Sequence, residues 1–244
     1  MNYETFAAVY DSVMDDSLYP QWLDFTKRHL NENVQTILEL ACGTGDLAIL
    51  LAQNNYQVTG LDLSNEMLTI ADRKAFDADC QMQFLQGDMR DLKDVGAFDA
   101  VTCFSDSLCY LSDEPDMQLT FDEVFSVLND GGTFIFDVHS VKQIEEGFKD
   151  YSFHDQTEEF AFLWDSYPGL VPHSVEHFLT FFVQENGETF IRHDELHQER
   201  TYPVADFLRM LENAGFTKVE VFGDFTDEAP TKECKRVFFV AHKD

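Results

Sequence analysis

The segment ILELACGTGDLA, residues 37–48, constrains the fold more strongly than any other part of the chain. An apolar, β-prone stretch ends there in a loop that contains Gly43 and Gly45, and a helical pattern follows at once. Glycine is required where a chain turns tightly and lies close to a ligand. The first turn of the helix then presents unpaired N–H groups. The segment therefore predicts a strand, a ligand-binding loop and a helix in direct succession.

Apolar, β-prone segments alternate with helical patterns over the first part of the chain. The predicted strands lie near residues 35–41, 56–62, 82–86, 98–104 and 132–138. The predicted helices lie near residues 3–14, 19–30, 46–54, 65–76 and 117–129, with a short helical turn after Asp91. Tyr19–Pro20 is expected to mark the break between the first two helices. Alternating strands and helices imply an α/β fold with a parallel sheet that is covered on both faces.

The pattern changes at residues 141–200, where the chain becomes aromatic, acidic and hairpin-like. Two β-prone arms flank Asn186–Gly187, which is a strong hairpin signal. The length of 244 residues suits one α/β domain with a single insertion. We therefore expect residues 1–140 and 201–244 to form the core, and residues 141–200 to form an inserted substrate lid.

A carboxylate stands inside the end of the first predicted strand, at Glu39, where an apolar residue would pack better. The spacing of Gly43, Gly45 and Ala48 also fits a dinucleotide-binding turn, but Glu39 would repel the anionic pyrophosphate of NAD and attract an ammonium group. The alternative is that Glu39 only braces the loop. The segment ELACGTG resembles the first motif of the class I, Rossmann-like S-adenosylmethionine-dependent methyltransferases. Ala41 departs from that motif, since many members have glycine there.

The end of the second predicted strand carries Asp62, whose carboxylate could accept hydrogen bonds from a ribose diol. NAD enzymes use the same chemistry, so Asp62 indicates a nucleoside without choosing between the two cofactors. The alternative is a helix cap, a role that Ser64 or Asn65 fills better. The resemblance also implies that Leu63 and Met67 contact the cofactor.

The third strand is followed by QGDMRDL, which resembles the methyltransferase motif that holds adenine. The resemblance implies that Asp88 accepts a hydrogen bond from the exocyclic amine and that Met89 packs on the ring. A solvated turn is the alternative for this segment. It would explain an acidic residue, but not the ordered run of glycine, aspartate and an apolar residue.

The segment FDAVTCFSDSLCYL, residues 98–111, resembles the fourth strand of these enzymes and the loop where the cofactor meets the substrate. The resemblance implies that Phe104 and Ser105 flank the methionine part of the cofactor. Asp106 and Tyr110 are then expected to face the methyl acceptor.

Near the N-terminus, Tyr10 and Tyr19 resemble the cap that some members with small-molecule substrates lay over the cofactor. An aromatic face near the sulfonium would add a cation–π attraction, and ordinary helix packing is the alternative.

A helix is expected after Pro203, and Gly215 is well placed to cap its C-terminus. Strands near residues 217–223 and 236–242 follow. Together these elements resemble the reversed hairpin that closes the methyltransferase sheet. The expected fold is thus a doubly wound, mostly parallel seven-stranded sheet with a C-terminal reversed β-hairpin and an antiparallel β insertion as a lid.

The acceptor could require a base if it arrives protonated. The candidates, in order, are Asp106, His139 and His154, and His139 is also expected to contact the substrate. The histidine pairs His173/His177 and His193/His197 have helical spacing. Their surroundings predict strands, in which that spacing would not form a metal-binding face, so no metal is expected.

The net charge of −30 arises from 46 acidic and 16 basic residues. Such a surface repels phosphate backbones and anionic membranes, which argues against nucleic acid and membrane partners. The five cysteines form no CxxC pair, the first residues lack the pattern of a signal peptide, and no apolar run could span a bilayer. A reduced, cytoplasmic protein is the simplest interpretation.

The sequence therefore predicts an S-adenosylmethionine-dependent methyltransferase with a small-molecule acceptor. The alternatives are a methyltransferase that acts on protein or RNA, a non-catalytic protein that binds the same cofactor, and a nicotinamide-dependent dehydrogenase. The acceptor and the oligomeric state do not follow from the sequence.

Overall fold

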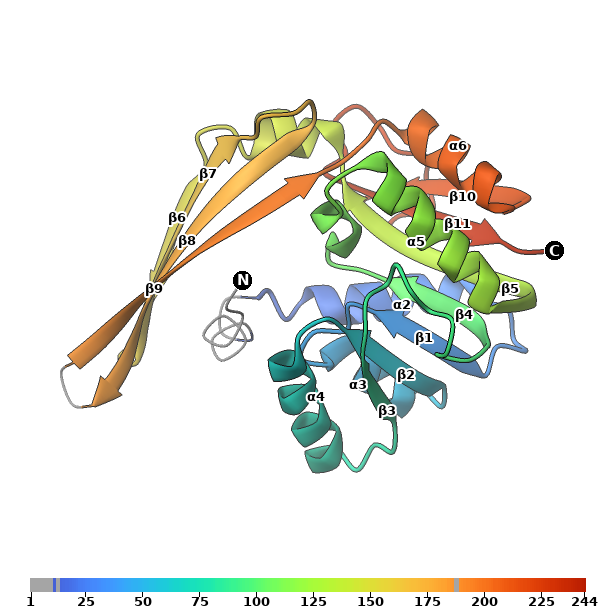
Figure 1. Ribbon diagram of the computed structural model, residues 1–244, viewed down its shortest axis with the longest axis horizontal. Helices are drawn as coiled ribbons and strands as arrows, with labels where there is room; N and C mark the ends of the chain where they lie inside the picture. Colours follow the sequence, from blue (N-terminus) through green and yellow to red (C-terminus); the bar gives the residue numbers. More distant parts are fainter. Residues whose placement is uncertain (1–10, 12–13, 187–188) are drawn as a thin grey trace.

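The computed structural model describes Asp11, residues 14–186 and residues 189–244 (Figure 1). It consists of a seven-stranded sheet flanked by helices and of a second, four-stranded sheet that projects from it as an arm. The helix expected near residues 3–14 and the Gly187 turn lie largely or wholly outside the described residues. Among the described residues, no helix is long and apolar enough to cross a membrane.

The larger sheet has the strand order β10-β11-β5-β4-β1-β2-β3. Its strands are β1 (Thr36–Leu40), β2 (Gln57–Asp62), β3 (Gln83–Gln86), β4 (Phe98–Cys103), β5 (Leu128–His139), β10 (Lys218–Gly223) and β11 (Arg236–His242). The first five pair in parallel, whereas β11 runs antiparallel to both β5 and β10. The predicted fold class, with its C-terminal reversed hairpin, is confirmed.

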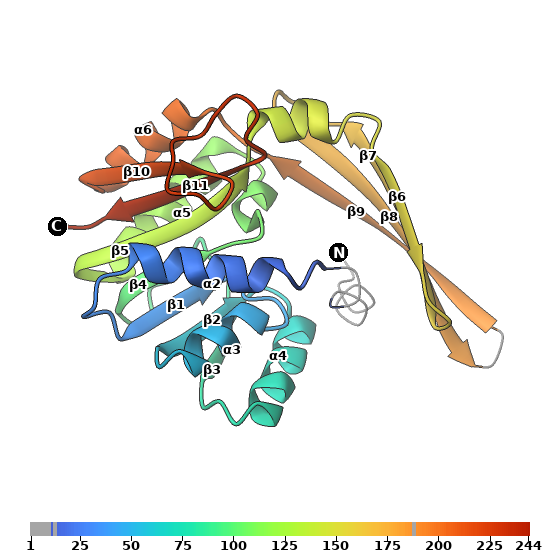
Figure 2. The ribbon, with the colours of Figure 1, turned by 180° about the vertical axis from the view of Figure 1, so that it is seen from behind.

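Helices cover both faces of this sheet, as the alternating pattern requires (Figure 2). They are α2 (Leu18–His29), α3 (Asp46–Gln53), α4 (Asn65–Asp77), α5 (Glu114–Val127) and α6 (Val204–Ala214). Buried side chains of α2 and α3 pack in one hydrophobic cluster, and those of α5 and α6 pack in another on the opposite face. Gly215 ends α6 in the left-handed conformation with φ of 110°, as predicted.

Two local predictions differ from the structure. Pro20 lies in the first turn of α2, where its missing N–H is not needed, so the helix begins before Tyr19–Pro20. The helical turn expected after Asp91 is wrong. The Asp88 carboxylate accepts the backbone N–H of Arg90, and the N–H of Leu92 bonds to Glu123 of α5. The connection between β3 and β4 therefore forms two hydrogen-bonded turns, in which the N–H groups of Asp91 and Val95 bond to the carbonyls of Asp88 and Leu92.

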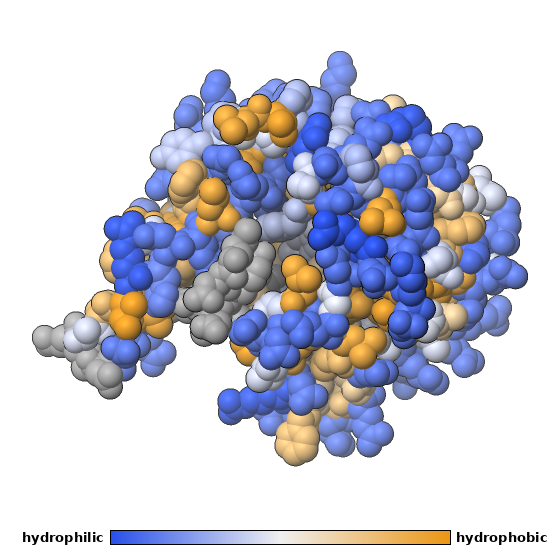
Figure 3. Space-filling view, in the orientation of Figure 1, coloured by the Kyte–Doolittle hydropathy of each residue, from blue (hydrophilic) through white to orange (hydrophobic). Residues whose placement is uncertain are grey.

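The segment between β5 and α6 forms the antiparallel sheet β6-β7-β8-β9. Its strands are β6 (Ser152–Gln156), β7 (Phe160–Pro168), β8 (Ser174–Asn186) and β9 (Thr189–Arg200), preceded by the short helix η2 (Gln143–Gly147). The pairing of Asn186 with Thr189 confirms the predicted hairpin strands. The chain leaves and rejoins the core at adjacent points, because Thr201 Oγ1 donates to the carbonyl of His139 at 2.6 Å. The face shown in Figure 3 is largely hydrophilic.

Candidate functional site

The loop after β1 carries three residues in the left-handed region: Ala41 (φ 53°), Gly43 (φ 54°) and Gly45 (φ 83°). A Cβ atom added to Gly43 would meet open space, whereas one added to Gly45 would lie 2.9 Å from the Cβ of Ala71. Gly45 is thus required for packing as well as for its backbone conformation. Gly43 instead leaves its backbone accessible to a ligand.

Ala41 is the one residue of this loop that pays a steric cost for its conformation, about 1–2 kcal/mol for a residue with a Cβ. Glycine would remove that strain and would lose about 0.5–1 kcal/mol of backbone entropy. We expect Ala41→Gly to stabilise the fold by about 0.5–1 kcal/mol, measured by urea unfolding. Ala52→Gly, inside α3, is the matched control and should destabilise by a similar amount. Equal losses in both variants would contradict the strain at Ala41.

The Asp62 carboxylate joins the loops after β1 and β2. One oxygen accepts the N–H of Gly43 at 2.8 Å and the other accepts the N–H of Ser64 at 2.8 Å. Burial raises the pKa of Asp62 above its ordinary value, and these backbone bonds oppose the rise. Ser64 caps α4 by accepting the N–H of Met67, as predicted. Asp62 is therefore held in a fixed position at the C-terminal end of β2.

Glu39 is a buried carboxylate, 4% exposed, at the end of β1. Its Oε2 atom makes no hydrogen bond among the described residues. Burial, reinforced by the charges of Asp46 and Asp62, raises the pKa of Glu39 to about 8. A buried carboxylate oxygen without a partner fits a ligand that brings an ammonium group.

The raised pKa of Glu39 predicts a pH-dependent stability. Between its ordinary value of 4.5 and about 8, the folded state holds a proton that the unfolded chain does not. This stabilisation is full below pH 4.5. It falls by about 1.4 kcal/mol per pH unit as the pH rises from 4.5, and it is lost once the pH has passed through about 8.

Glu39→Gln should remove this component, so the difference in unfolding free energy between variant and wild type should change by that slope between about pH 5.5 and 7.5. Urea titrations at several pH values measure it. Glu212→Gln, at an exposed position of α6, should run parallel to the wild type. A parallel curve for Glu39→Gln would show that Glu39 is ionised in the folded protein.

The other predicted cofactor residues lie along the same edge of the sheet. Asp88 is gripped by Arg90, whose Nε and Nη2 atoms donate to its carboxylate at 3.0 and 2.6 Å, and this bonding lowers the pKa of Asp88. Met89 packs partly buried against the core. The Leu63 side chain is 60% exposed beside Asp62, which leaves an apolar surface free to contact a ligand.

Phe104 and Ser105 follow β4. Phe104 is buried and stacks on Trp22, with ring centroids 6.1 Å apart, so it contacts the core more than open space. Ser105 and Asp106 both adopt positive φ, 57° and 58°. Tyr19 packs against Trp22, and Tyr10 lies outside the described residues. Two successive strained residues at the end of a strand are typical of functional sites.

A buried cation, Arg236, holds this part of the site together. Its Nη1 atom donates to Asp106 at 2.5 Å and to Asp137 at 2.7 Å, and its Nη2 atom donates to Asp106 at 3.1 Å. Asp137 is fully buried and also accepts the indole N–H of Trp22 and the backbone N–H of Asp106. The sequence analysis did not identify Arg236, Asp137 or Trp22. Burial raises the pKa of Asp106, while the charge of Arg236 opposes the rise.

Strand β9 of the arm contributes the side chains of His197 and Glu199 to the surroundings of Asp106. The Nε2 atom of His139 lies 3.1 Å from Asp106 and 3.5 Å from Glu199. The hydroxyl of Tyr110 lies 3.1 Å from Nδ1 of His197 and hydrogen-bonds Glu199. Asp106, Tyr110 and His139, which were predicted to face the acceptor, are therefore brought together. Glu199 and His197 are additions that the sequence analysis missed.

Burial is the main cause of the pKa shifts of His139 and Glu199. It lowers the pKa of His139 to about 3, with the charge of Arg236 acting in the same direction. Burial also raises the pKa of Glu199 to about 8, with Asp106 as the second cause. His154, the third candidate base, lies exposed on β6, at the opposite edge of the arm from β9.

The histidines of the arm do not form a metal centre. His177 and His197 face each other across β8 and β9, and Nδ1 of His177 accepts the indole N–H of Trp164. Within the described parts of the chain, no group of three or more His, Cys, Asp or Glu side chains could hold a metal ion.

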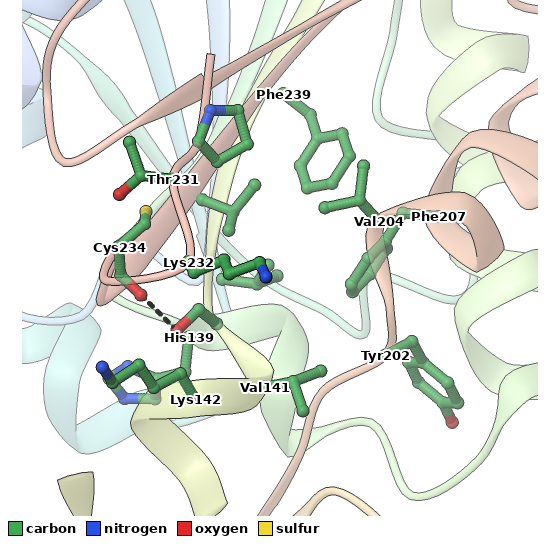
Figure 4. A pocket seen from close by; sticks show the side chains of 14 residues that line it. His139, Val141, Lys142, Tyr202, Val204, Phe207, Thr231, Lys232, Cys234 and Phe239 are labelled. Carbon is green, nitrogen blue, oxygen red and sulfur yellow. Dashed lines mark hydrogen bonds between the residues drawn. The ribbon is translucent and has the colours of Figure 1, made fainter. Parts of the chain in front are cut away.

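A cavity of about 240 Å³ lies between the end of β5, the start of α6 and the loop before β11 (Figure 4). Val237 and Phe239 of β11 line it, whereas Arg236 and Phe238, which alternate with them along the strand, do not. Because side chains alternate along a strand, the cavity lies on the opposite face of β11 from Arg236. It contains none of the predicted cofactor residues.

Comparisons with known proteins agree with this geometry. The methyltransferase domain family matches residues 37–132. A protein of Geobacillus sp. (strain WCH70) that is named as a methyltransferase is 42% identical over the full length of both chains. The glycine/sarcosine N-methyltransferase of Halorhodospira halochloris is 28% identical over 96% of this chain and 85% of its own.

The fold is also similar to a solved structure. An S-adenosylmethionine-dependent methyltransferase from Clostridium acetobutylicum ATCC 824 superposes with a TM-score of 0.85 at 28% identity. The match covers 99% of this chain and 98% of that one, so it includes the arm as well as the larger sheet.

Proposed function

This chain belongs to the class I S-adenosylmethionine-dependent methyltransferases, and we propose that it methylates a small molecule held between the larger sheet and the arm. The cofactor of the family, S-adenosylmethionine, supplies a methyl group that its sulfonium has already activated. The chain therefore needs to bind, align and shield the reactants, and to manage the proton of the acceptor.

The cofactor would be held by the loops after β1 and β2. Glu39 would bind the ammonium of the methionine part, and Asp62 would bind the ribose hydroxyls. The open backbone at Gly43 allows the close approach that this requires. Asp88 would accept a hydrogen bond from the adenine amine in addition to those from Arg90. The exposed side chain of Leu63 would contact the adenine ring.

The observation that carries the proposal is the contact of β9 with the end of the larger sheet. Glu199 and His197 of the arm reach His139 and Tyr110, which belong to the core. The arm thus completes the site beyond the cofactor residues and would act as a lid over the acceptor. Asp106, Tyr110 and His139 would face the acceptor from the core.

Three further points support a small acceptor. The net charge of −30 opposes the approach of RNA, and the side chains of Asp106 and His139, two of the groups proposed to face the acceptor, are each only 12% exposed. The relative from Halorhodospira halochloris, which is similar along nearly the whole chain, is named for glycine and sarcosine as its acceptors.

The test is label transfer from S-adenosylmethionine that carries a tritiated methyl group. The protein is incubated with cell extract, and the extract is then separated into small molecules, protein and RNA. Label in the small-molecule fraction is the expected result. Label in protein or RNA would overturn the proposal, and so would no label from a protein that binds S-adenosylhomocysteine.

A further inference from the structure

We propose that the acceptor is a primary or secondary amine, which binds as an ammonium ion to Glu199 and gives a proton to it before methyl transfer. This inference rests on the proposed function, since it names the class of acceptor for the same site. Three features of the described residues support it: an unsatisfied carboxylate, a local excess of negative groups and the position of Glu199 at the end of the sheet.

Glu199 is 7% exposed, and its Oε2 atom has no hydrogen-bond partner in the part of the chain that the structure describes. The nearest side chains that could carry a positive charge close to Glu199 are two histidines. Nε2 of His139 lies 3.5 Å from Oε2, and Nε2 of His177 lies 3.6 Å from Oε1. A buried carboxylate oxygen left in this state costs free energy until a donor reaches it.

The neighbouring cations cannot supply the missing charge. Arg236 is already bonded to both Asp106 and Asp137. Burial lowers the pKa of both His139 and His177 to about 3, so both rings are neutral at physiological pH. The carboxylates of this cluster therefore exceed its cations when Glu199 is ionised.

Glu195 adds a further buried acidic side chain to this cluster. It lies four residues before Glu199 on β9, on the same face of the strand. Its Oε2 atom is 3.0 Å from Nε2 of His197, and its Oε1 atom has no hydrogen-bond partner among the described atoms. An ammonium ion would bring both the positive charge and several N–H donors, whereas a hydroxyl acceptor would bring one donor and no charge.

The protonation of Glu199 suits this role. Burial, with the charge of Asp106 acting in the same direction, raises the pKa of Glu199 to about 8 against the opposing effects of Tyr110 and Arg236. His139 and His177 face the same carboxyl group as neutral rings. In the free protein Glu199 is thus protonated at neutral pH, and pairing with an ammonium ion would release that proton to solvent.

The chemical step then balances as follows. One N–H proton of the bound ammonium moves to the Glu199 carboxylate, which leaves a neutral amine with a lone pair. That lone pair forms the new C–N bond while the methyl–sulfur bond breaks, and the breaking pair stays on sulfur. The methylated nitrogen carries the positive charge, and the proton on Glu199 returns to solvent.

The first test uses the small-molecule fraction that accepts label. Acetylation of its primary and secondary amines with an N-hydroxysuccinimide ester, before incubation with the enzyme, should abolish label transfer. The labelled product of the untreated fraction should bind a cation exchanger at acidic pH. Undiminished transfer after acetylation would overturn the inference and leave the small-molecule acceptor intact.

The second test is Glu199→Gln, which keeps the shape of the side chain and removes its basicity. Transfer should fall about 100-fold or more, which is the usual contribution of a general base, and the limb of kcat/KM that rises through about pH 8 should disappear. The affinity for S-adenosylhomocysteine should stay unchanged, which shows that the fold and the cofactor site are intact.

Glu176→Gln is the matched control. Glu176 lies on β8 opposite Gln198, the residue before Glu199, so it projects from the other face of the arm. It should transfer label at the wild-type rate. Transfer by Glu199→Gln within threefold of Glu176→Gln, or the same pH profile in both, would overturn the role of Glu199. Label in protein or RNA would instead overturn the proposed function.

Discussion

Replacing Arg236 with methionine is expected to destabilise the fold by about 3–5 kcal/mol. The arginine is bonded to Asp106 and Asp137, and its guanidinium lies 5.6 Å from the ring centroid of Trp22. Removing it leaves two buried carboxylates without a compensating charge. Methionine has a similar volume, so the decrease in unfolding free energy would reflect the missing charge more than a change in packing. Urea unfolding at neutral pH measures it.

Arg209→Met is the matched control for this change. Arg209 also contacts two acidic residues, Glu114 at 3.0 Å and Asp206 at 3.4 Å, but its side chain is 45% exposed. Water screens such a pair, so the variant should stay within about 0.5 kcal/mol of the wild type. Similar losses in the two variants would show that the burial of Arg236 does not matter.

The second large effect is expected for Asp62→Ala, which should weaken the binding of S-adenosylhomocysteine by roughly 100-fold. Hydrogen bonds to a charged group contribute about 1.5–3 kcal/mol each, and the proposed ribose contact uses this carboxylate. The substitution also frees the N–H groups of Gly43 and Ser64, which the carboxylate now holds. Isothermal titration calorimetry measures the affinity directly, without a methyl acceptor.

Asp77→Ala controls for the loss of one negative charge nearby, because Asp77 is exposed at the far end of α4. Its affinity should match that of the wild type. A folded Asp62→Ala protein with unchanged affinity would remove Asp62 from the cofactor site.

The larger sheet could be predicted from the sequence because its signals are local. Each strand of β1 to β5 contains a short β-prone run, and the glycines of the first loop have no good substitute at their backbone angles. Glu39 and Asp62 could be singled out for the same reason, since each is a carboxylate at the end of an apolar strand.

The residues that hold Asp106 and His139 in place could not be predicted, because they lie far from these two residues in the sequence. Arg236 and Asp106 are joined across 130 positions, and Trp22 and Asp137 across 115. In the sequence, Arg236 only ends a short basic stretch that begins at Lys232. Nothing local distinguishes Glu199 from the other acidic residues of the arm. One signal was present in retrospect: Arg236 opens an apolar strand, where an unpaired charge would not be tolerated.

The chain leaves the core for the arm and returns to it at adjacent points, where Thr201 meets His139. The entropy of closing a loop rises only with the logarithm of its length, so doubling the length between these residues would cost about 0.6 kcal/mol. Insertions at the outer tip of β8 and β9 would thus have little leverage on the loops after β1 and β2. If the arm covers the acceptor as proposed, its outer part can therefore change in length and sequence without disturbing the loops proposed to bind the cofactor.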